Sequence, residues 1–255
     1  MHPLTQRRPY RIPALLSTID SVVAAESTRH GGVSPAPFAS LNLGLNTADD
    51  PANVTENRRR FFGELGVDPE RVASSHQVHG TAILYTTAPG HADGYDALIT
   101  DQPGLLLAVS VADCVPVLIY DSEHGAVAAV HAGWRGTAGG IVTRTLEAMQ
   151  QRFNTHPGSC YAYIGTCIDE TSFAVSADVA EQFSPDVRRV DPYTGKFFIN
   201  LKSANSKQLT DFGIPAAQLG ISTFSTVLDN DDYFSHRLEN GQTGRMLAVI
   251  GLKPF

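Results

Sequence analysis

Three short segments each place a histidine or a cysteine beside the predicted end of a β-strand. They are Ser-His-Gln-Val-His-Gly at residues 75–80, Ala-Asp-Cys at residues 112–114, and Val-His-Ala-Gly-Trp-Arg-Gly at residues 130–136. Zinc favours imidazole and thiolate ligands, and a catalytic zinc keeps three protein ligands and one open position. His79, Cys114 and His131 satisfy that count. No local spacing such as Cys-x-x-Cys fixes such a site, so three unrelated polar side chains are the alternative interpretation.

Glycines crowd the passage from the strand that ends at Val130 into the helix that follows, at positions 133, 136, 139 and 140. Glycine lets a ligand approach the backbone, and a helix N-terminus presents free N–H groups to an anion. Thr137 is available as a helix cap, and Arg135 could supply a bidentate contact to a phosphate or carboxylate. The segment lacks the Gly-Lys-Ser/Thr of a phosphate-binding Walker loop. The alternative is that these glycines only let helix and strand pack closely.

The elements that must position these side chains alternate between short apolar strands and amphipathic helices. Strands are expected at residues 21–27, 105–111, 115–120, 125–130, 161–165, 196–200, 221–227 and 246–251. Helices are expected at residues 51–66, 137–153, 176–183 and 201–212. Strands this short and apolar suit burial on both faces, so helices must cover the sheet. The sequence therefore predicts a layered α/β or α+β domain, with mixed β-sheets flanked by helices.

Two of the three candidate ligands follow from this arrangement of strands. Cys114 comes after the apolar run at 105–111, and His131 closes the run at 125–130. One further strand separates the two runs, so neighbouring strand ends could converge on one rim. Sites in layered α/β proteins commonly form at such rims, on loops held by rigid strands.

The composition bounds the class of protein. The chain has 255 residues, of which 42% are hydrophobic and 18% charged, so a sizeable core can form. Neither a repeat nor a long linker interrupts it, and a single domain over residues 1–255 is expected. The formal net charge of −7 disfavours binding to nucleic acid. No stretch reaches the roughly 18 apolar residues of a membrane span.

The N-terminal part and the cysteines indicate the compartment. Residues 12–25 are interrupted by polar side chains and make a poor signal peptide. The three cysteines, Cys114, Cys160 and Cys167, are an odd number and form no disulfide framework. A cytoplasmic protein is expected, in which each cysteine is a buried apolar side chain, a metal ligand or a nucleophile.

Taken together, these motifs resemble the laccase-domain family, also called YfiH-like or polyphenol-oxidase-like proteins. The resemblance continues at residues 40–44, 56–58, 96–100, 164–165 and 243–246, in order along nearly the whole chain. It implies a single domain of mixed sheets and flanking helices. It also implies that His79, Cys114 and His131 are catalytic residues and ligands of a zinc ion, with His76 left as a neighbouring or structural residue.

The chain departs from the family pattern at two places outside these ligands. Thr166 stands where the family usually has proline after Ile-Gly, and Ser225-Thr226 stands where a Cys-Thr pair is expected. The first departure is expected to alter a loop over the substrate and with it the fine specificity.

The activity that the resemblance implies is purine nucleoside phosphorolysis. Adenosine, inosine or methylthioadenosine would react with phosphate to give the free base and ribose 1-phosphate, or its methylthio counterpart, with adenosine deamination as a side activity. A zinc-bound water would serve the deamination. Arg135 is the first candidate for a phosphate contact, and Asn42, Asn57 and Arg58 are further candidates. The partners would be a purine nucleoside and phosphate, while the oligomeric state is not predicted.

Two other enzymatic functions remain open. A copper-dependent polyphenol oxidase could use the same His₂Cys set, but several coppers need paired histidines and the chain has no His-x-His, so zinc is favoured over copper. A cysteine-type amidase or hydrolase, acting in peptidoglycan precursor editing, would use Cys114 as nucleophile and His131 as base. Zinc ligation would occupy the same sulfur, so the two roles exclude each other in any one state.

Overall fold

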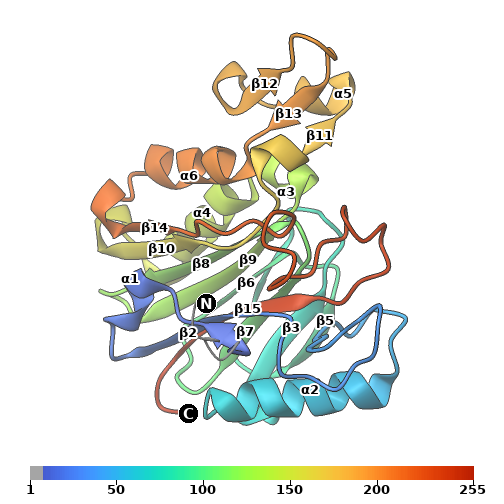
Figure 1. Cartoon of the computed structure of the whole chain (residues 1–255). Helices are drawn as coiled ribbons and strands as arrows, with labels where there is room; N and C mark the ends of the chain where they lie inside the picture. Colours follow the sequence, from blue (N-terminus) through green and yellow to red (C-terminus); the bar gives the residue numbers. More distant parts are fainter. Residues whose placement is uncertain (1–7) are drawn as a thin grey trace, which may run out of the picture.

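The computed structural model describes residues 8–255, so the first seven residues of the predicted domain lie outside the described residues (Figure 1). Two six-stranded sheets pack face to face. The first sheet has the order β1 (Tyr10–Arg11), β2 (Val22–Ser27), β15 (Met246–Leu252), β7 (Leu106–Val111), β3 (Val72–His76) and β5 (Gly90–Asp93). The second has the order β14 (Leu219–Ile221), β10 (Cys160–Ile164), β8 (Val115–Asp121), β9 (Ala126–Ala132), β6 (Ala97–Thr100) and β4 (Ile83–Tyr85).

Both sheets are mixed. In the first sheet β3 runs parallel to β5 and β7, while β15 is antiparallel to β2 and β7. In the second, β8 is antiparallel to β9 and β10, while β4–β6 and β10–β14 are parallel pairs. A third, three-stranded sheet of β11 (Ala174–Val175), β13 (Phe197–Ile199) and β12 (Arg188–Val190) lies apart from the other two in Figure 1.

Helices cover the outer faces of the two large sheets (Figure 1). The covering helices are α2 (Pro51–Glu64) on the first sheet, and α4 (Ile141–Phe153) and α6 (Leu201–Phe212) on the second. The short helices are α1 (Ala14–Ser17), α3 (Trp134–Ala138) and α5 (Ala177–Ala180), of which α5 lies beside the three-stranded sheet. Five short 3₁₀ segments complete the described part: Pro69–Arg71, Pro157–Ser159, Glu170–Ser172, Pro185–Val187 and Ala216–Gln218. None of the described helices is long and apolar enough to cross a membrane.

Alternation along the central strands divides the core into three layers. On β7, Leu107 points between the two sheets, whereas Leu106 points to the layer beneath α2. On β8, Leu118 points between the sheets, whereas Val117 faces the layer that contains α4 and α6 residues. Both faces of the central strands are therefore buried, and the prediction of mixed sheets flanked by helices is confirmed.

Two predicted elements are wrong in their extent. The helix expected over 137–153 breaks at Gly139 and Gly140, where Gly140 has φ +75°, so that α3 ends at Ala138 and α4 begins at Ile141. Thr137 consequently lies inside α3 and is not its cap. The strand expected over 221–227 stops at Ile221, and the chain then forms an irregular segment as far as β15.

Smaller differences affect the ends of elements. The predicted helix over 176–183 shrinks to the one-turn α5, and β9 extends two residues further than predicted, to Ala132. His131 therefore lies within a central strand rather than in the loop after it.

Candidate metal centre

The side chains of His79, Cys114 and His131 offer ligand atoms that all lie within 4.8 Å of one another. His79 is exposed, Cys114 half-buried and His131 buried, so the group opens to one side only. Two imidazoles and one thiolate with an open side match the donor set of a catalytic transition-metal site. These three residues could hold a metal ion.

Strand register explains why residues so far apart in the sequence meet. In the antiparallel pair β8–β9, Val115 lies opposite Ala132 and Pro116 opposite His131, so Cys114 precedes its strand at the point where β9 ends. In the pair β6–β9, Ala97 lies opposite Val130, which brings Asp96 to His131.

The loop that carries His79 is fixed by an amide side chain. Gln77 exchanges two hydrogen bonds with the backbone of Ser110 in β7, each of 2.7 Å. His79 itself has φ +60°, a left-handed conformation that few non-glycine residues adopt. The chain thus turns sharply after β3 and presents the imidazole to Cys114.

Asp96 is the residue that sequence reasoning missed. This fully buried carboxylate accepts the Nδ1–H of His131 at 2.8 Å and the backbone N–H groups of His79 at 2.9 Å and Gly80 at 2.7 Å. Burial alone would raise the pKa of Asp96, but these hydrogen bonds hold it below its usual value. Because Nδ1 of His131 is engaged, Nε2 is the atom left to face a metal.

The electrostatics of the group favour a thiolate. Burial would raise the pKa of the Cys114 thiol, but the facing His131 and His79 side chains lower it to about 6. Burial would likewise lower the pKa of His131, but Cys114 and Asp96 raise it to about 9. By contrast, burial raises the pKa of both Cys160 and Cys167 to about 12. Cys114 is thus the one cysteine suited to ligation or nucleophilic attack.

Close packing explains two of the glycines after His131. A Cβ on Gly133 would lie 2.9 Å from Cδ2 of His79 and 3.2 Å from Sγ of Cys114, inside the ligand group. A Cβ on Gly136 would lie 2.9 Å from the carbonyl oxygen of Gly80. The packing interpretation of these glycines therefore accounts for both positions.

The three residues lie in a cavity of about 470 Å³. Its wall carries six basic or imidazole side chains besides the candidate ligands: Arg58, Arg237, Arg245, His76, His91 and His236. The carboxylate in the lining belongs to Asp113, whose backbone has φ +81°. It accepts hydrogen bonds from the hydroxyls of Thr226 at 2.5 Å and Ser235 at 2.8 Å, and from the backbone N–H of Arg237 at 2.6 Å. Asp113 thereby attaches the irregular segment 222–245 to the turn that carries Cys114.

The residues predicted to contact substrate occupy three different environments. Arg58 lines the cavity. Asn42 and Asn57 are fully buried behind it, and their amide groups bond to neighbouring protein atoms. Arg135 is exposed, lies outside the cavity lining and places its guanidinium 4.2 Å from the ring centroid of Trp134.

His76 and the two departures from the family pattern are also placed. His76 lines the outer part of the cavity and bonds Asp93 at 2.8 Å, outside the three-residue ligand group. Thr166 is buried and donates its N–H and hydroxyl to Glu26 rather than lining the cavity. Thr226 bonds Asp113, as described above.

Known proteins resemble this chain in sequence and in fold. The profile of the family described as multi-copper polyphenol oxidoreductase laccase matches residues 23–253. The purine nucleoside phosphorylase YlmD of Geobacillus stearothermophilus is 38% identical over 245 residues, covering 90% of this chain and 89% of the relative. A purine nucleoside phosphorylase of Deinococcus radiodurans is 40% identical over 243 residues, covering 94% and 93%.

Solved structures agree with these relatives. The crystal structure of YlmD from Geobacillus stearothermophilus has a TM-score of 0.91 at 36% identity and covers 97% of both chains. The YfiH protein of Bacillus licheniformis has a TM-score of 0.88 at 31% identity, covering 96% of this chain and 100% of that one. The chain therefore belongs to the multi-copper polyphenol oxidoreductase laccase family, the YfiH-like proteins that its motifs resemble.

Proposed function

We propose that this chain is a zinc-dependent purine nucleoside phosphorylase, formed by a single domain over residues 1–255. Its substrates are adenosine, inosine and methylthioadenosine with phosphate, and adenosine deamination is a side activity. The observation that carries this proposal is the cluster of His79, Cys114 and His131 ligand atoms within 4.8 Å, in the cavity of a chain whose relatives are named purine nucleoside phosphorylases.

The donor set supports zinc as the metal. Two imidazoles and a thiolate are ligands that zinc prefers, and three protein ligands leave one position open. If these residues hold zinc, the ion would supply a Lewis acid and, for deamination, would lower the pKa of a water towards about 7. Asp96 holds the imidazole of His131 in the tautomer that ligation requires.

The phosphorolysis itself exchanges one bond for another. The C1′–N bond of the nucleoside breaks, its electron pair leaves with the purine, and a phosphate oxygen bonds to C1′. The proton of hydrogen phosphate ends on the purine, so the reaction needs no further reagent. The residues of this chain must therefore bind phosphate next to the sugar and exclude bulk water.

Among the four residues predicted for substrate and phosphate contact, Arg58 is the one in the cavity lining. We therefore place the phosphate on the Arg58 side of the cavity and not at Arg135. Asn42 and Asn57 support that wall from behind. We place the activity in the cytoplasm, where three free cysteines are ordinary.

The test is the product of the reaction. Purified, zinc-loaded protein should convert inosine to hypoxanthine and ribose 1-phosphate, measured by chromatography, and should release no hypoxanthine when phosphate is omitted. If the protein converts neither adenosine nor inosine in the presence of phosphate, the proposal is wrong.

A cysteine hydrolase is the second candidate, because the lowered pKa of Cys114, the raised pKa of His131 and the Asp96–His131 hydrogen bond also suit a Cys-His-Asp nucleophile. Alkylation of Cys114 in the presence of saturating zinc would favour this function, since ligation protects the sulfur. Protection by zinc would favour the phosphorylase.

A further inference from the structure

The three arginines of the cavity wall, Arg58, Arg237 and Arg245, form no ion pair with a carboxylate among residues 8–255, and of these Arg58 and Arg245 are the two withdrawn from water. Both are partly buried, and burial lowers the pKa of Arg58 to about 10. The exposed neighbours Arg59 and Arg60, in contrast, both pair with Glu56. A guanidinium withdrawn from water is costly unless a negative group compensates it. These two lack such a group within the described chain.

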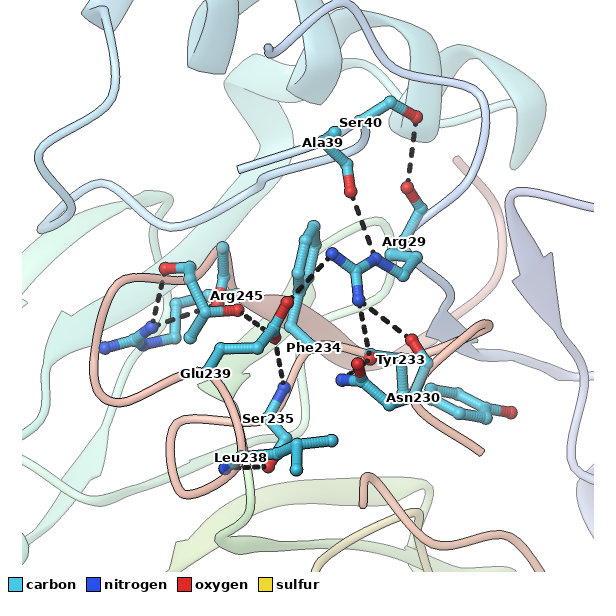
Figure 2. Close-up of polar contacts among 12 residues, drawn as sticks. Arg29, Ala39, Ser40, Asn230, Tyr233, Phe234, Ser235, Leu238, Glu239 and Arg245 are labelled. Atoms are coloured by element: carbon cyan, nitrogen blue, oxygen red, sulfur yellow. Dashed lines mark hydrogen bonds and ion pairs between the residues drawn. The ribbon is translucent and has the colours of Figure 1, made fainter. Parts of the chain in front are cut away.

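The hydrogen bonds that both arginines do make orient them without neutralising them. The Nη1–H group of Arg58 donates a hydrogen bond to the carbonyl oxygen of Leu43 at 3.0 Å. Arg245 donates its Nη1 to the carbonyls of Thr243 and Gly244, both at 3.0 Å (Figure 2). Each guanidinium keeps further N–H donors in the fork that matches an oxyanion.

One short segment, residues 42–44, supports both arginines. The N–H of Leu43 donates to the carbonyl of Arg245 at 3.0 Å, while its own carbonyl accepts from Arg58. Asn42 accepts the N–H of Arg245 at 2.9 Å. A Cβ on Gly44 would lie 2.7 Å from Cγ of Arg245, so the segment packs directly against that side chain.

Asn57 completes this support from α2. Its amide donates to the carbonyl of Asn42 at 2.9 Å, one position before Arg58 on the same helix. Asn42 and Asn57, which were predicted as substrate contacts, are therefore placed to position the two arginines relative to each other.

The surroundings are electropositive. The pKa of His91 is lowered by burial and by the nearby positive charge of Arg58. The one carboxylate of the lining, Asp113, is occupied by the three hydrogen bonds of the 222–245 segment. On a chain of net charge −7, this wall is an exception that favours an anionic ligand.

We propose that Arg58 and Arg245 form one anion site that binds a phosphate group in the same cavity as His79, Cys114 and His131. Both arginines line the cavity that also contains Cys114, and both bond to the segment 42–44, which brings them to one wall of it. The shared chemistry is a tetrahedral phosphate oxyanion. Its source is either free orthophosphate or the 5′-phosphate of a nucleotide, and the choice of orthophosphate rests on the proposed function.

The direct test is calorimetric titration of the zinc-loaded full chain with orthophosphate. Arg58→Gln and Arg245→Gln should each weaken binding by about 10-fold or more, because charge-assisted bidentate contacts are lost. Arg135→Gln, which removes an exposed arginine outside the cavity, should leave binding unchanged. Circular dichroism and zinc content serve to show that each variant is folded and loaded.

Steady-state kinetics distinguish loss of phosphate binding from general structural damage, because only the former changes the KM for phosphate selectively. The two cavity variants should raise the KM for phosphate while the KM for inosine stays within about 2-fold, and Arg245→Lys should restore part of the phosphate affinity by returning the charge. If the anion is instead a nucleotide 5′-phosphate, wild type should bind inosine 5′-phosphate more tightly than inosine, and both variants should abolish that preference.

The double variant carries both Arg58→Gln and Arg245→Gln. If this variant folds and binds phosphate as tightly as wild type, or if Arg135→Gln loses phosphate affinity, the proposed anion site is wrong. Phosphate binding that depends on both arginines without any inosine turnover would keep the site and reject the phosphorylase. Normal turnover with an unchanged KM for phosphate in the double variant would reject the site and keep the phosphorylase.

Discussion

The two sides of the cavity are built by different means. Two of the three candidate metal ligands are placed by regular structure: His131 lies within β9, and the β8–β9 register places Cys114 beside it. The side chains of Gln77 and Asp96 hold the loop that carries the third, His79. The side that carries the two arginines combines Arg58 of α2 with residues 42–44 and the segment 222–245, which have no helix or strand of their own. The metal side therefore depends more on backbone ladders, and the arginine side depends more on side-chain hydrogen bonds.

A carboxylate with several hydrogen bonds has the same structural role on each of the two sides: the buried Asp96 on one and the half-buried Glu239 on the other. Asp96 joins the His79 loop to His131, as described above. On the other side, Glu239 accepts from Arg29 at 3.0 Å, from the Ser235 N–H at 2.9 Å and from the Thr243 hydroxyl at 2.5 Å (Figure 2). The Arg29 guanidinium extends this network to the carbonyls of three other residues, Ala39, Asn230 and Tyr233.

This difference implies that the two functions of the cavity can be separated. A change on the strand side should act on metal binding, while a change in the 222–245 segment should act on the anion. The following predictions test that separation, in order of decreasing effect.

Removing a ligand should have the largest effect. Cys114→Ala should reduce bound zinc from about one per chain to less than about 0.1 and abolish phosphorolysis, because two histidines alone hold zinc weakly. Elemental analysis and the inosine assay measure both. Cys160→Ala removes a buried free cysteine outside the cavity and is the matched control. Full zinc content in Cys114→Ala would mean that this sulfur is not a ligand.

Loss of the buried carboxylate behind the ligands should have the next largest effect. Asp96→Asn should weaken zinc binding by about 10- to 100-fold, because the amide no longer attracts the Nδ1–H of His131. Competition with a chelator of known affinity measures the change. The affinity for orthophosphate of the fully zinc-loaded variant should stay within about 3-fold of wild type, and a larger loss would contradict the separation of the two sides.

The corresponding change on the other side should be smaller. Glu239→Gln leaves Arg29 without its carboxylate and should loosen the segment that ends in Arg245, raising the KM for phosphate by about 3- to 10-fold. Zinc affinity should stay within about 2-fold. Asp211→Asn, which breaks an exposed ion pair with Lys207, is the control. Equal losses of zinc and phosphate affinity in Glu239→Gln would show that the two sides are coupled.

The smallest effect concerns pH. After zinc is removed by a chelator, Cys114 with a pKa of about 6 is a thiolate above that pH and becomes a thiol as the pH falls through it. Its rate of alkylation should therefore fall only about 2-fold between pH 8 and pH 6, whereas an ordinary cysteine slows by about 80-fold. Mass spectrometry of the alkylated peptide gives the rates. An 80-fold fall at Cys114 would refute the thiolate.

The same contrast between regular and irregular structure explains what could be predicted from the sequence. The runs at 105–111, 115–120 and 125–130 are strands because strands buried on both faces leave a continuous apolar pattern. The irregular segment 222–245 leaves no such pattern. Residues 221–227 are rich in β-branched side chains and resemble a strand, but Ser225 and Thr226 instead form hydrogen bonds to Asp169 and Asp113.

The residues of the candidate site also divide into those that could be selected from the sequence and those that could not. The histidines and the cysteine could be selected because their types suit a metal. Asp96 and Arg245 could not, because their positions depend on contacts between segments that are far apart in the chain. Arg135 is close in sequence to a candidate ligand, yet it is not among the residues that line the cavity, and its guanidinium lies over the ring of Trp134.

The central claim is that zinc at His79, Cys114 and His131 supports phosphorolysis of purine nucleosides. The most direct measurement titrates metal-free protein with zinc and follows ribose 1-phosphate formed from inosine and phosphate. Turnover should rise in proportion to added zinc and level off at one zinc per chain, with no product when phosphate is omitted. Full turnover in the metal-free protein, or hypoxanthine release that does not depend on phosphate, would contradict the claim.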